Sequence, residues 1–140
     1  MAAPLKQHRV FVVDDEDVIA STLAMILRFQ GGFHARSFNN PGEALDAASY
    51  DPPDLLISDV VMPALSGIEL AIKMRALCPE CKVLLFSGQP STADMFESAR
   101  LNGYDFELLS KPVHPGDLLA RIRNLTECPP PVWPSQELQT

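Results

Sequence analysis

The stretch LLISDVVMP, residues 55–63, decides the fold of this chain. An apolar run ends there in a single carboxylate, Asp59, and a Pro-containing loop follows at once. In an α/β protein this pattern places Asp59 at the carboxyl end of a buried strand, where such sheets build their binding sites. A lone Asp at this place also serves as a turn cap. Its interpretation therefore depends on which other residues reach the same edge.

Short apolar runs and segments of helical spacing alternate along the whole chain. The runs that predict strands are residues 9–13, 33–38, 55–58, 82–86 and 106–110. The segments that predict helices are residues 17–30, 40–50, 66–77, 91–102 and 115–125. Five strands that alternate with five helices indicate an α/β fold, in which a parallel sheet is wrapped by helices on both faces.

Local signals set the ends of these elements. Ile19, Leu23, Ile26 and Phe29 (or Gln30) recur at helical spacing and predict the apolar side of the first helix, which Gly31-Gly32 ends. Asn40-Pro41-Gly42-Glu43 supplies an N-cap, Pro at the first helical position and an acid at the third. Ser66-Gly67-Ile68-Glu69 is a capping box for the third helix. Residues 33–38 alternate apolar and polar, which is typical of a half-exposed edge strand.

Composition and charge bound the function. A chain of 140 residues fits one domain with its own core. The net charge of −7, without a basic stripe, argues against direct binding to nucleic acid or to an anionic membrane. No signal-peptide pattern and no membrane-spanning apolar run are visible, so a cytoplasmic location is expected. Residues 1–7 are predicted to be a flexible tail, residues 8–126 the domain, and residues 127–140 a Pro-rich tail or linker.

Three cysteines are an odd number, whereas a disulfide framework needs pairs. Cys78-Pro79-Glu80-Cys81 has the C-x-x-C spacing of redox motifs. Such motifs open a helix, where the dipole lowers the thiol pKa, but this one lies between a helical segment and a strand. Zinc would need four ligands, and Cys128 is the one further cysteine. We therefore favour a loop with two thiols over a redox or metal site.

Polar side chains follow four of the predicted strands. Asp14 and Asp15 follow the first, Asp59 the third, Ser87 the fourth and Lys111 the fifth. Parallel strands all end at the same edge of a sheet, so we expect three carboxylates, a hydroxyl and an ammonium to share one crevice. Each residue alone also has an ordinary structural role as a cap, a turn residue or a surface charge. All five at one edge indicate a functional site.

The charges of this group indicate its chemistry. Three clustered carboxylates repel one another unless a cation joins them. Carboxylate oxygens suit Mg²⁺, which also retains waters and phosphate oxygens in its coordination sphere. An aspartate beside Mg²⁺ and facing Lys111 and Ser87 is equipped to receive a phosphoryl group, because both side chains would stabilise the charge on its oxygens.

This ordered set of motifs resembles the receiver (CheY-like) domain of bacterial two-component response regulators. The resemblance covers roughly residues 8–126. The matching motifs are Asp14-Asp15, Asp59 with Met62-Pro63 and Gly67 behind it, Ser87-Gly88 and Lys111-Pro112. It implies a flavodoxin-like, doubly wound sheet with strand order 2-1-3-4-5 and five helices.

The resemblance also implies a mechanism. Asp59 would be phosphorylated by a sensor histidine kinase or a histidine phosphotransfer protein. Mg²⁺ would be held by Asp15, Asp59 and the Val61 backbone carbonyl, with Asp14 acting largely through water. Lys111 would precede a cis proline at position 112, an otherwise uncommon bond.

The chain would then act as a switch, not as an enzyme on a separate substrate. It would catalyse only its own phosphoryl transfer and slow autodephosphorylation. Phosphorylation would alter the face of the fourth helix, fifth strand and fifth helix, which binds a downstream protein; phosphorylation-dependent homodimerisation is a further outcome. The chain would be either a stand-alone receiver or a fragment of a longer regulator.

The chain departs from the usual receiver pattern at three positions. Receivers usually carry an aromatic residue three positions before the Lys, and here that residue is Leu108, with Tyr104 and Phe106 nearby. Gly103 lies one residue further from the Lys than usual. Val61 cannot orient a hydrolytic water through a side-chain hydrogen bond, so we expect a comparatively long-lived acyl phosphate.

Two other functions share parts of this pattern. An aspartate-nucleophile phosphohydrolase also combines an Asp after its first strand with a Ser or Thr and a Lys. Its D-x-D motif would need a second Asp where this chain has Glu16, and the chain lacks the length for a substrate cap. A binding module that is never phosphorylated would have no need of the full acidic set with Ser87 and Lys111.

Overall fold

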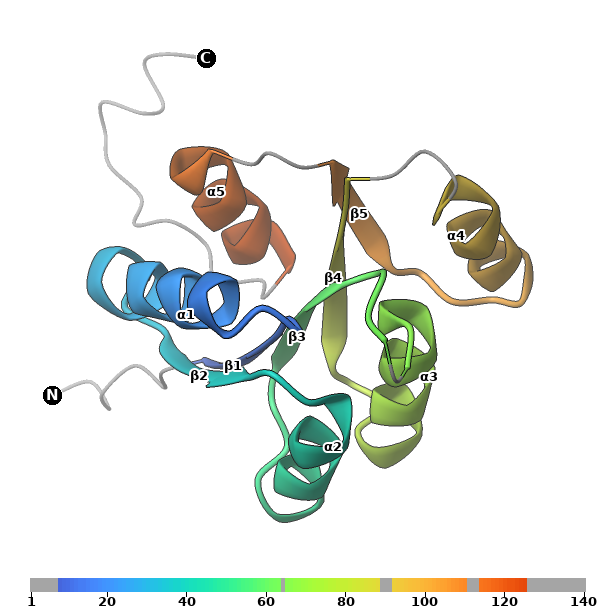
Figure 1. Ribbon diagram of the computed structural model, residues 1–140, viewed down its shortest axis with the longest axis horizontal. Coiled ribbons are helices and arrows are strands. Elements are labelled where there is room, and N and C mark those ends of the chain that lie inside the picture. Colours follow the sequence, from blue (N-terminus) through green and yellow to red (C-terminus); the bar gives the residue numbers. More distant parts are fainter. Residues whose placement is uncertain (1–7, 64, 89–91, 111–113, 126–140) are drawn as a thin grey trace, which may run out of the picture.

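The computed structural model describes residues 8–63, 65–88, 92–110 and 114–125, which form a five-stranded parallel sheet covered by helices on both faces (Figure 1). The strands are β1 (Arg9–Val13), β2 (His34–Phe38), β3 (Leu55–Asp59), β4 (Lys82–Ser87) and β5 (Glu107–Ser110). The helices are α1 (Asp17–Gly31), α2 (Pro41–Tyr50), α3 (Gly67–Leu77), α4 (Thr92–Leu101) and α5 (Pro115–Leu125). The predicted alternation of strands and helices is confirmed in these residues.

The strands lie in the order β2-β1-β3-β4-β5, and every neighbouring pair is parallel. This is the flavodoxin-like fold that the resemblance implied. All five strands begin at one edge of the sheet, here called the amino edge, and end at the other, the carboxyl edge. Each helix then returns the chain from the carboxyl edge to the amino edge. Residues that directly follow strands therefore meet at the carboxyl edge.

Alternate residues of the central strands enter two separate cores. In β1, Phe11 and Val13 pack under α2 and α3, whereas Val10 and Val12 pack under α1 and α5. Strands β3 and β4 divide their apolar residues in the same way. Burial on both faces explains why these strands are continuous apolar runs in the sequence. Edge strand β2 instead buries Ala35 and exposes its neighbours His34 and Arg36, as its alternation predicted.

The two predicted N-caps are confirmed. The Asn40 side chain caps α2 by accepting hydrogen bonds from the backbone N–H groups of Gly42 (2.7 Å) and Glu43 (3.4 Å). The Ser66 hydroxyl caps α3 by accepting from the N–H of Glu69 at 3.1 Å. These bonds satisfy N–H groups that have no partner inside the helix. The cap of α3 matters most for function, because this helix starts directly behind Asp59.

Helix α1 differs from the sequence prediction in the side it buries. The residues that contact the sheet are Ala20, Ala24 and Leu27. Of the predicted stripe, Leu23 packs against this core, Ile19 and Ile26 are half-buried on the flank, and Phe29 and Gln30 are exposed, Phe29 by 80%. Small alanine side chains let the helix approach the sheet closely, which turns the larger apolar residues outward. The predicted helix is confirmed, whereas its buried side is centred on the alanines and Leu27 and includes only Leu23 of the predicted stripe.

Candidate functional site

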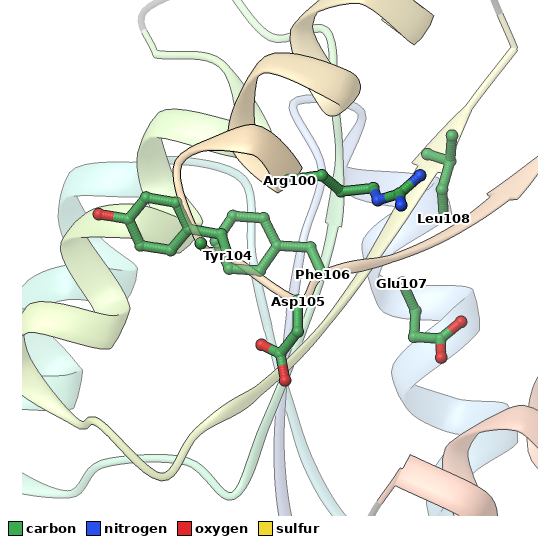
Figure 2. Close-up of a pocket in the computed structure, with 7 residues that line it drawn as sticks. Arg100, Tyr104, Asp105, Phe106, Glu107 and Leu108 are labelled. Atoms are coloured by element: carbon green, nitrogen blue, oxygen red, sulfur yellow. The ribbon is translucent and has the colours of Figure 1, made fainter.

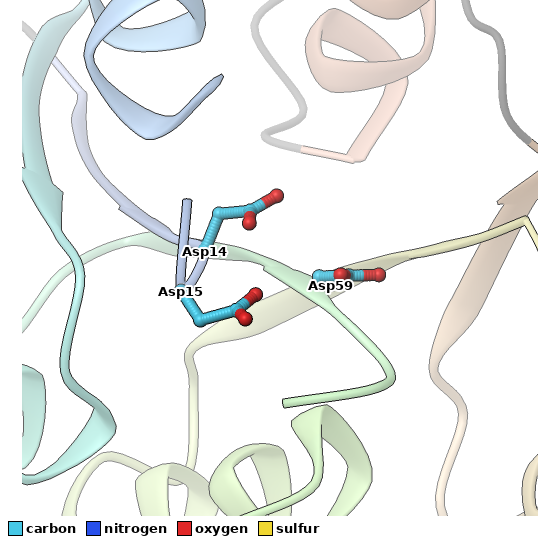
Figure 3. Close-up of side chains that lie close together, drawn as sticks. All are labelled: Asp14, Asp15 and Asp59. Atoms are coloured by element: carbon cyan, nitrogen blue, oxygen red, sulfur yellow. The ribbon is translucent and has the colours of Figure 1, made fainter. Parts of the chain in front are cut away.

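The ends of β1 and β3 bring three aspartates together. The register pairs Val13 with Ser58, so Asp14 and Asp59 follow in step on neighbouring strands. One carboxylate oxygen from each of Asp14, Asp15 and Asp59 lies within 4.8 Å of the others. Figure 3 shows Asp14 and Asp15 extending from the end of β1 toward the same space as Asp59. The prediction that these three side chains meet at the carboxyl edge is confirmed in the geometry.

The three aspartates differ in exposure. Asp14 is only 2% exposed; its backbone N–H donates to the Phe38 carbonyl at 3.1 Å, and its Oδ1 accepts from the Glu16 N–H at 2.9 Å. Asp59 is half-buried and Asp15 is exposed. The N-cap of α1 is Glu16, so neither Asp14 nor Asp15 occupies the capping position. The carboxylates therefore range from a fixed, buried member to one that solvent reaches freely.

The loop after Asp59 is held tightly against the sheet. The N–H of Val60 donates to the Phe86 carbonyl at 2.9 Å, and the N–H of Gly67 donates to the Val60 carbonyl at 2.8 Å. A β-carbon on Gly67 would collide with the Asp59 carbonyl group and approach the Ser58 hydroxyl. Glycine is therefore required where the start of α3 closes on the end of β3. The side chain of Val61 is exposed within this loop.

Ser87 ends β4 at the same edge and is buried. Its register partner is Ser110, the last residue of β5. Lys111 follows Ser110 in the chain, so the sequence continues from this edge into the predicted Lys111-Pro112 pair. Lys111 and Pro112 themselves lie outside the described residues. The structure thus shows the three aspartates and Ser87 at the carboxyl edge, and the position of Lys111 stays a prediction.

The donor set fits a small, hard divalent cation. All three side chains offer carboxylate oxygens, the ligand type that Mg²⁺ and Ca²⁺ prefer. Oxygens on opposite sides of an octahedral Mg²⁺ are about 4.2 Å apart, twice the usual Mg–O distance. The carboxylates of Asp14, Asp15 and Asp59, within 4.8 Å of one another, need little movement to share one ion. Binding would also remove the repulsion between like charges.

The C-x-x-C pair lies at the amino edge, between α3 and β4, away from the aspartates. Cys78 and Cys81 are free thiols, and Cys81 is fully buried. Burial, with a smaller contribution from Cys78, raises the pKa of the Cys81 thiol to about 12. Such a thiol holds its proton at physiological pH, which disfavours nucleophilic or metal-binding chemistry. Cys128 lies outside the described residues.

Comparison with known proteins now decides the family. The model of the response regulator receiver domain family matches residues 10–123 of the chain. The chain belongs to this family. The match lies inside the predicted limits of the receiver, residues 8–126, which remain predictions at both ends.

Relatives of this receiver include transcriptional regulators. The Escherichia coli transcriptional regulatory protein CreB is 33% identical over 121 residues, which cover 86% of this chain and 52% of that protein. A probable transcriptional regulatory protein of Mycobacterium tuberculosis, TcrX, is 31% identical over 116 residues, 83% of this chain and 48% of that protein. The chain therefore spans about half the length of the curated relatives it matches.

Solved receiver domains share the whole fold. A CheY-like receiver domain protein of Methanospirillum hungatei superposes with a TM-score of 0.77 at 29% identity, covering 87% of this chain and 95% of that one. A receiver domain protein of Clostridium thermocellum gives a TM-score of 0.77 at 27% identity, covering 86% of this chain and 95% of that one.

Of the helices described, none has the length and hydrophobicity needed to cross a bilayer.

The aromatic residues near β5 occupy a different place from the one receivers usually use. Leu108 pairs with Leu85 in mid-sheet and is half-buried. Phe106 precedes β5 at the amino edge, where it is buried and stacks on Tyr104 with ring centroids 5.2 Å apart. Tyr104, Phe106 and Leu108 all belong to or pack against the same apolar cluster, and Figure 2 shows the two rings beside the start of β5, apart from Leu108. Neither ring occupies the position of Leu108.

Arg75 fixes Phe106 in place, a role that the sequence did not reveal. Its guanidinium lies 5.3 Å from the Phe106 ring centroid, its Nε donates to the Cys81 carbonyl at 2.5 Å, and its Nη2 bonds Asp105 at 2.8 Å. A surface pocket of about 570 Å³ opens beside these aromatics, and Arg100, Tyr104, Phe106 and Leu108 are among the residues that line it. With Phe106 fixed, Tyr104 is the aromatic side chain that lines this pocket without full burial.

Proposed function

We propose that this receiver is a phosphorylation-dependent switch in which Asp59 is the phosphoacceptor. The observation that carries the proposal is the group of Asp14, Asp15 and Asp59 at the carboxyl edge, with Ser87 at the end of the next strand. Membership of the receiver family supports the same assignment. Asp59 is the member that ends a central strand and is neither buried like Asp14 nor fully exposed like Asp15.

The phosphoryl donor is a phosphohistidine of a sensor histidine kinase or of a histidine phosphotransfer protein. A carboxylate oxygen of Asp59 attacks phosphorus, the P–N bond of the donor breaks, and the imidazole leaves and takes up a proton. The product is an acyl phosphate on Asp59. The Ser87 hydroxyl donates a hydrogen bond to a phosphoryl oxygen, and the Lys111 ammonium neutralises its charge. Both groups act most strongly once the phosphoryl oxygens have arrived.

Mg²⁺ is the proposed cofactor of this transfer. Asp15, Asp59 and the Val61 backbone carbonyl would hold the ion, and the buried Asp14 would act largely through water. When bound, the ion would neutralise charge on the phosphoryl oxygens. The same carboxylates that repel one another without a cation would thus become its ligands.

The decisive experiment is intact-mass analysis after incubation with a small acyl-phosphate donor and Mg²⁺. We expect the mass of one phosphoryl group to be added, and Asp59→Asn to abolish the addition. Peptide mapping of the trapped phosphate then locates it. Phosphate on Asp14 or Asp15 would favour the phosphohydrolase, and no mass shift even with the cognate kinase would favour a binding module that is never phosphorylated.

The acyl phosphate of this receiver is proposed to be comparatively long-lived. Val61 is exposed beside Asp59 but offers no side-chain hydrogen bond to a hydrolytic water. We expect Val61→Asn to speed the loss of phosphate from Asp59, and Val61→Ala, which changes size without adding a polar group, to leave the rate near its original value. Equal rates for the original protein and Val61→Asn would contradict this account.

The downstream signal is proposed to leave through the α4-β5-α5 face. This face contains the 570 Å³ pocket that Tyr104 and Leu108 help to line, and an ion pair between Arg121 of α5 and Glu107 of β5 at 2.8 Å. A separate protein, a second copy of the receiver, or an output domain in a longer regulator would read it. The cytoplasm, where histidine kinases present their phosphodonor, is the proposed location.

A further inference from the structure

The residue directly before Asp59 is a serine that lies inside an apolar strand. Ser58 is only 1% exposed, and the three residues before it in β3, Leu55 to Ile57, are all buried apolar side chains. Strand alternation places Ser58 on the same face as Leu56, which packs in the core beneath α2 and α3. A hydroxyl buried among apolar side chains lowers stability unless it forms a hydrogen bond. The role of Ser58 therefore depends on the bond that it makes.

The Ser58 hydroxyl holds the peptide unit that leaves Asp59. It donates a hydrogen bond to the Asp59 carbonyl at 2.9 Å. On the other side of the same peptide bond, the Val60 N–H donates to the Phe86 carbonyl of β4 at 2.9 Å. Because a peptide unit is planar, bonds at its C=O and its N–H together fix the orientation of the whole plane. A side chain of β3 and the backbone of β4 thus share the control of this one unit.

The orientation of this peptide unit reaches two proposed Mg²⁺ ligands. On one side of it, the α-carbon of Asp59 carries the carboxylate; on the other side, Val60 leads to the Val61 carbonyl. The chain has only two soft dihedral angles per residue, so a rotation of this peptide plane moves the Val61 carbonyl relative to the Asp59 carboxylate. The Gly67 N–H, which donates to the Val60 carbonyl at 2.8 Å, closes the loop over the same unit. The two ligands keep a fixed relation only while the unit is held.

The first residue of α3 packs directly on the bond between Ser58 and Asp59. A β-carbon on Gly67 would collide with the Asp59 carbonyl and lie 3.0 Å from the Ser58 hydroxyl. This close packing and the burial of Ser58 keep bulk water away from the bond. If the hydroxyl is removed, water does not readily take its place, and the Asp59 carbonyl loses a donor. Alanine at position 58 would therefore loosen the peptide unit without filling any additional space.

We propose that Ser58 is a positioning residue of the cation site. Its hydroxyl would touch neither the ion nor the phosphoryl group; it acts through the Asp59–Val60 peptide unit, which sets the Asp59 carboxylate and the Val61 carbonyl in the geometry of one coordination sphere. Mg²⁺ demands a nearly ideal octahedron, so a misplaced ligand lowers its affinity. Loss of a group that orients metal ligands typically weakens binding by about 10- to 100-fold. Ser58 has this role only if the two groups are Mg²⁺ ligands, so the proposal rests on the proposed function.

Calorimetric titration of the full chain with Mg²⁺ tests this role. We expect Ser58→Ala to weaken Mg²⁺ binding about tenfold, because the two ligands no longer keep a fixed relation. Ser58→Thr keeps the hydroxyl and should restore most of the affinity. The matched control is Ser37→Ala, which removes a half-buried serine hydroxyl from edge strand β2 and should leave the affinity unchanged.

Amide hydrogen exchange without Mg²⁺ separates positioning from a purely structural role. Ser58→Ala should speed exchange at the Val60 and Gly67 N–H groups about fivefold or more, because the peptide unit and the loop over it open more easily. This acceleration should exceed that of the slowest-exchanging amides of β1, which report on global unfolding. A purely structural hydroxyl would instead speed all of these amides by one factor and leave Mg²⁺ binding to the folded protein at its original strength.

An Mg²⁺ affinity that Ser58→Ala leaves unchanged would overturn the proposal, and so would an equal loss in folded Ser58→Ala and Ser58→Thr. The titration contains no phosphodonor, so its result is distinguishable from the outcome of the phosphorylation experiment. A chain that binds Mg²⁺ but gains no phosphoryl group would contradict phosphorylation at Asp59 alone, and Ser58→Ala should still weaken the binding of the ion. Absence of any Mg²⁺ binding by the original chain would overturn both proposals.

Discussion

The two edges of the sheet treat charge in opposite ways. At the amino edge, opposite charges are paired: Arg9 with Asp51, and Arg75 with Asp105 at 2.8 Å. At the carboxyl edge, three like charges are gathered within 4.8 Å. Clustered carboxylates lower the stability of a fold, whereas paired charges do not. The comparison indicates that the amino edge is built for stability and the carboxyl edge for binding a cation and a phosphoryl group.

The largest loss of stability is expected from a substitution that forces open the loop after Asp59. We expect Gly67→Ala to destabilise the domain by about 3 kcal/mol, because the added methyl collides with backbone and not with a movable side chain. Urea unfolding would measure it, together with weaker binding of Mg²⁺. Gly116→Ala in α5 is the matched control, since its nearest contacts belong to the exposed His114 side chain. Equal losses for both variants would show that the Asp59 loop is not closely held.

Removing Arg75 tests the amino edge in the same way. Arg75→Ala should lower the free energy of unfolding by about 2 kcal/mol, because the bond to the Cys81 carbonyl, the pair with Asp105 and the contact with Phe106 are lost together. Binding of Mg²⁺ at the far edge should be unchanged. Arg121→Ala, which breaks the half-exposed pair with Glu107, should cost less than about 1 kcal/mol. A large effect of Arg75→Ala on Mg²⁺ affinity would contradict the separation of the two edges.

Binding of Mg²⁺ should offset the repulsion between the three carboxylates at the carboxyl edge. At ten times its dissociation constant the ion should raise the free energy of unfolding by about 1.4 kcal/mol. Asp15→Asn should reduce this gain and slightly stabilise the protein without Mg²⁺, because one of three like charges is removed. Glu80→Gln removes an exposed acid at the amino edge and should change neither. Thermal unfolding with and without Mg²⁺ would show the difference, and an equal response of both variants would argue against the assigned site.

The sequence predicted the carboxyl edge better than the amino edge for a physical reason. Asp14, Asp59 and Ser87 each follow an apolar run, and parallel topology alone brings such residues together. The Arg75 contact joins residues from three separate segments, and no local pattern marks it. The position of the Arg75 guanidinium depends on how side chains pack between α3, the start of β4 and the residues that precede β5.

Helix α1 shows a second limit of sequence patterns. The spacing of Ile19, Leu23 and Ile26 predicts a helix but does not predict which of its sides faces the sheet. The buried side consists of Ala20, Ala24 and Leu27, of which the two alanines give only a weak apolar signal in the sequence. Phe29, which that pattern includes as an alternative to Gln30, is 80% exposed. Lys111, the predicted partner of the phosphoryl group, lies outside the described residues and stays a prediction.

Acid titration tests how much the Arg75–Asp105 ion pair at the amino edge contributes to stability. The hydrogen bond from Arg75 lowers the pKa of Asp105 below the ordinary value for an aspartate. A lowered pKa contributes stability that is complete above the unfolded pKa and is lost as pH falls through the folded pKa. Because the Asp105 side chain is 74% exposed, solvent screening limits this contribution to less than about 1 kcal/mol.

Asp105→Asn should therefore flatten the fall in unfolding free energy below about pH 4. Urea unfolding at a series of pH values would measure the slope. The matched control is Asp46→Asn on α2, an exposed acid for which no ion pair is described, and it should leave the slope unchanged. If Asp105→Asn and the original protein lose stability in parallel, the Arg75–Asp105 bond adds nothing beyond the contact of Arg75 with Phe106 and the Cys81 carbonyl. The pairing of charges at the amino edge would then be a matter of packing and not of electrostatics.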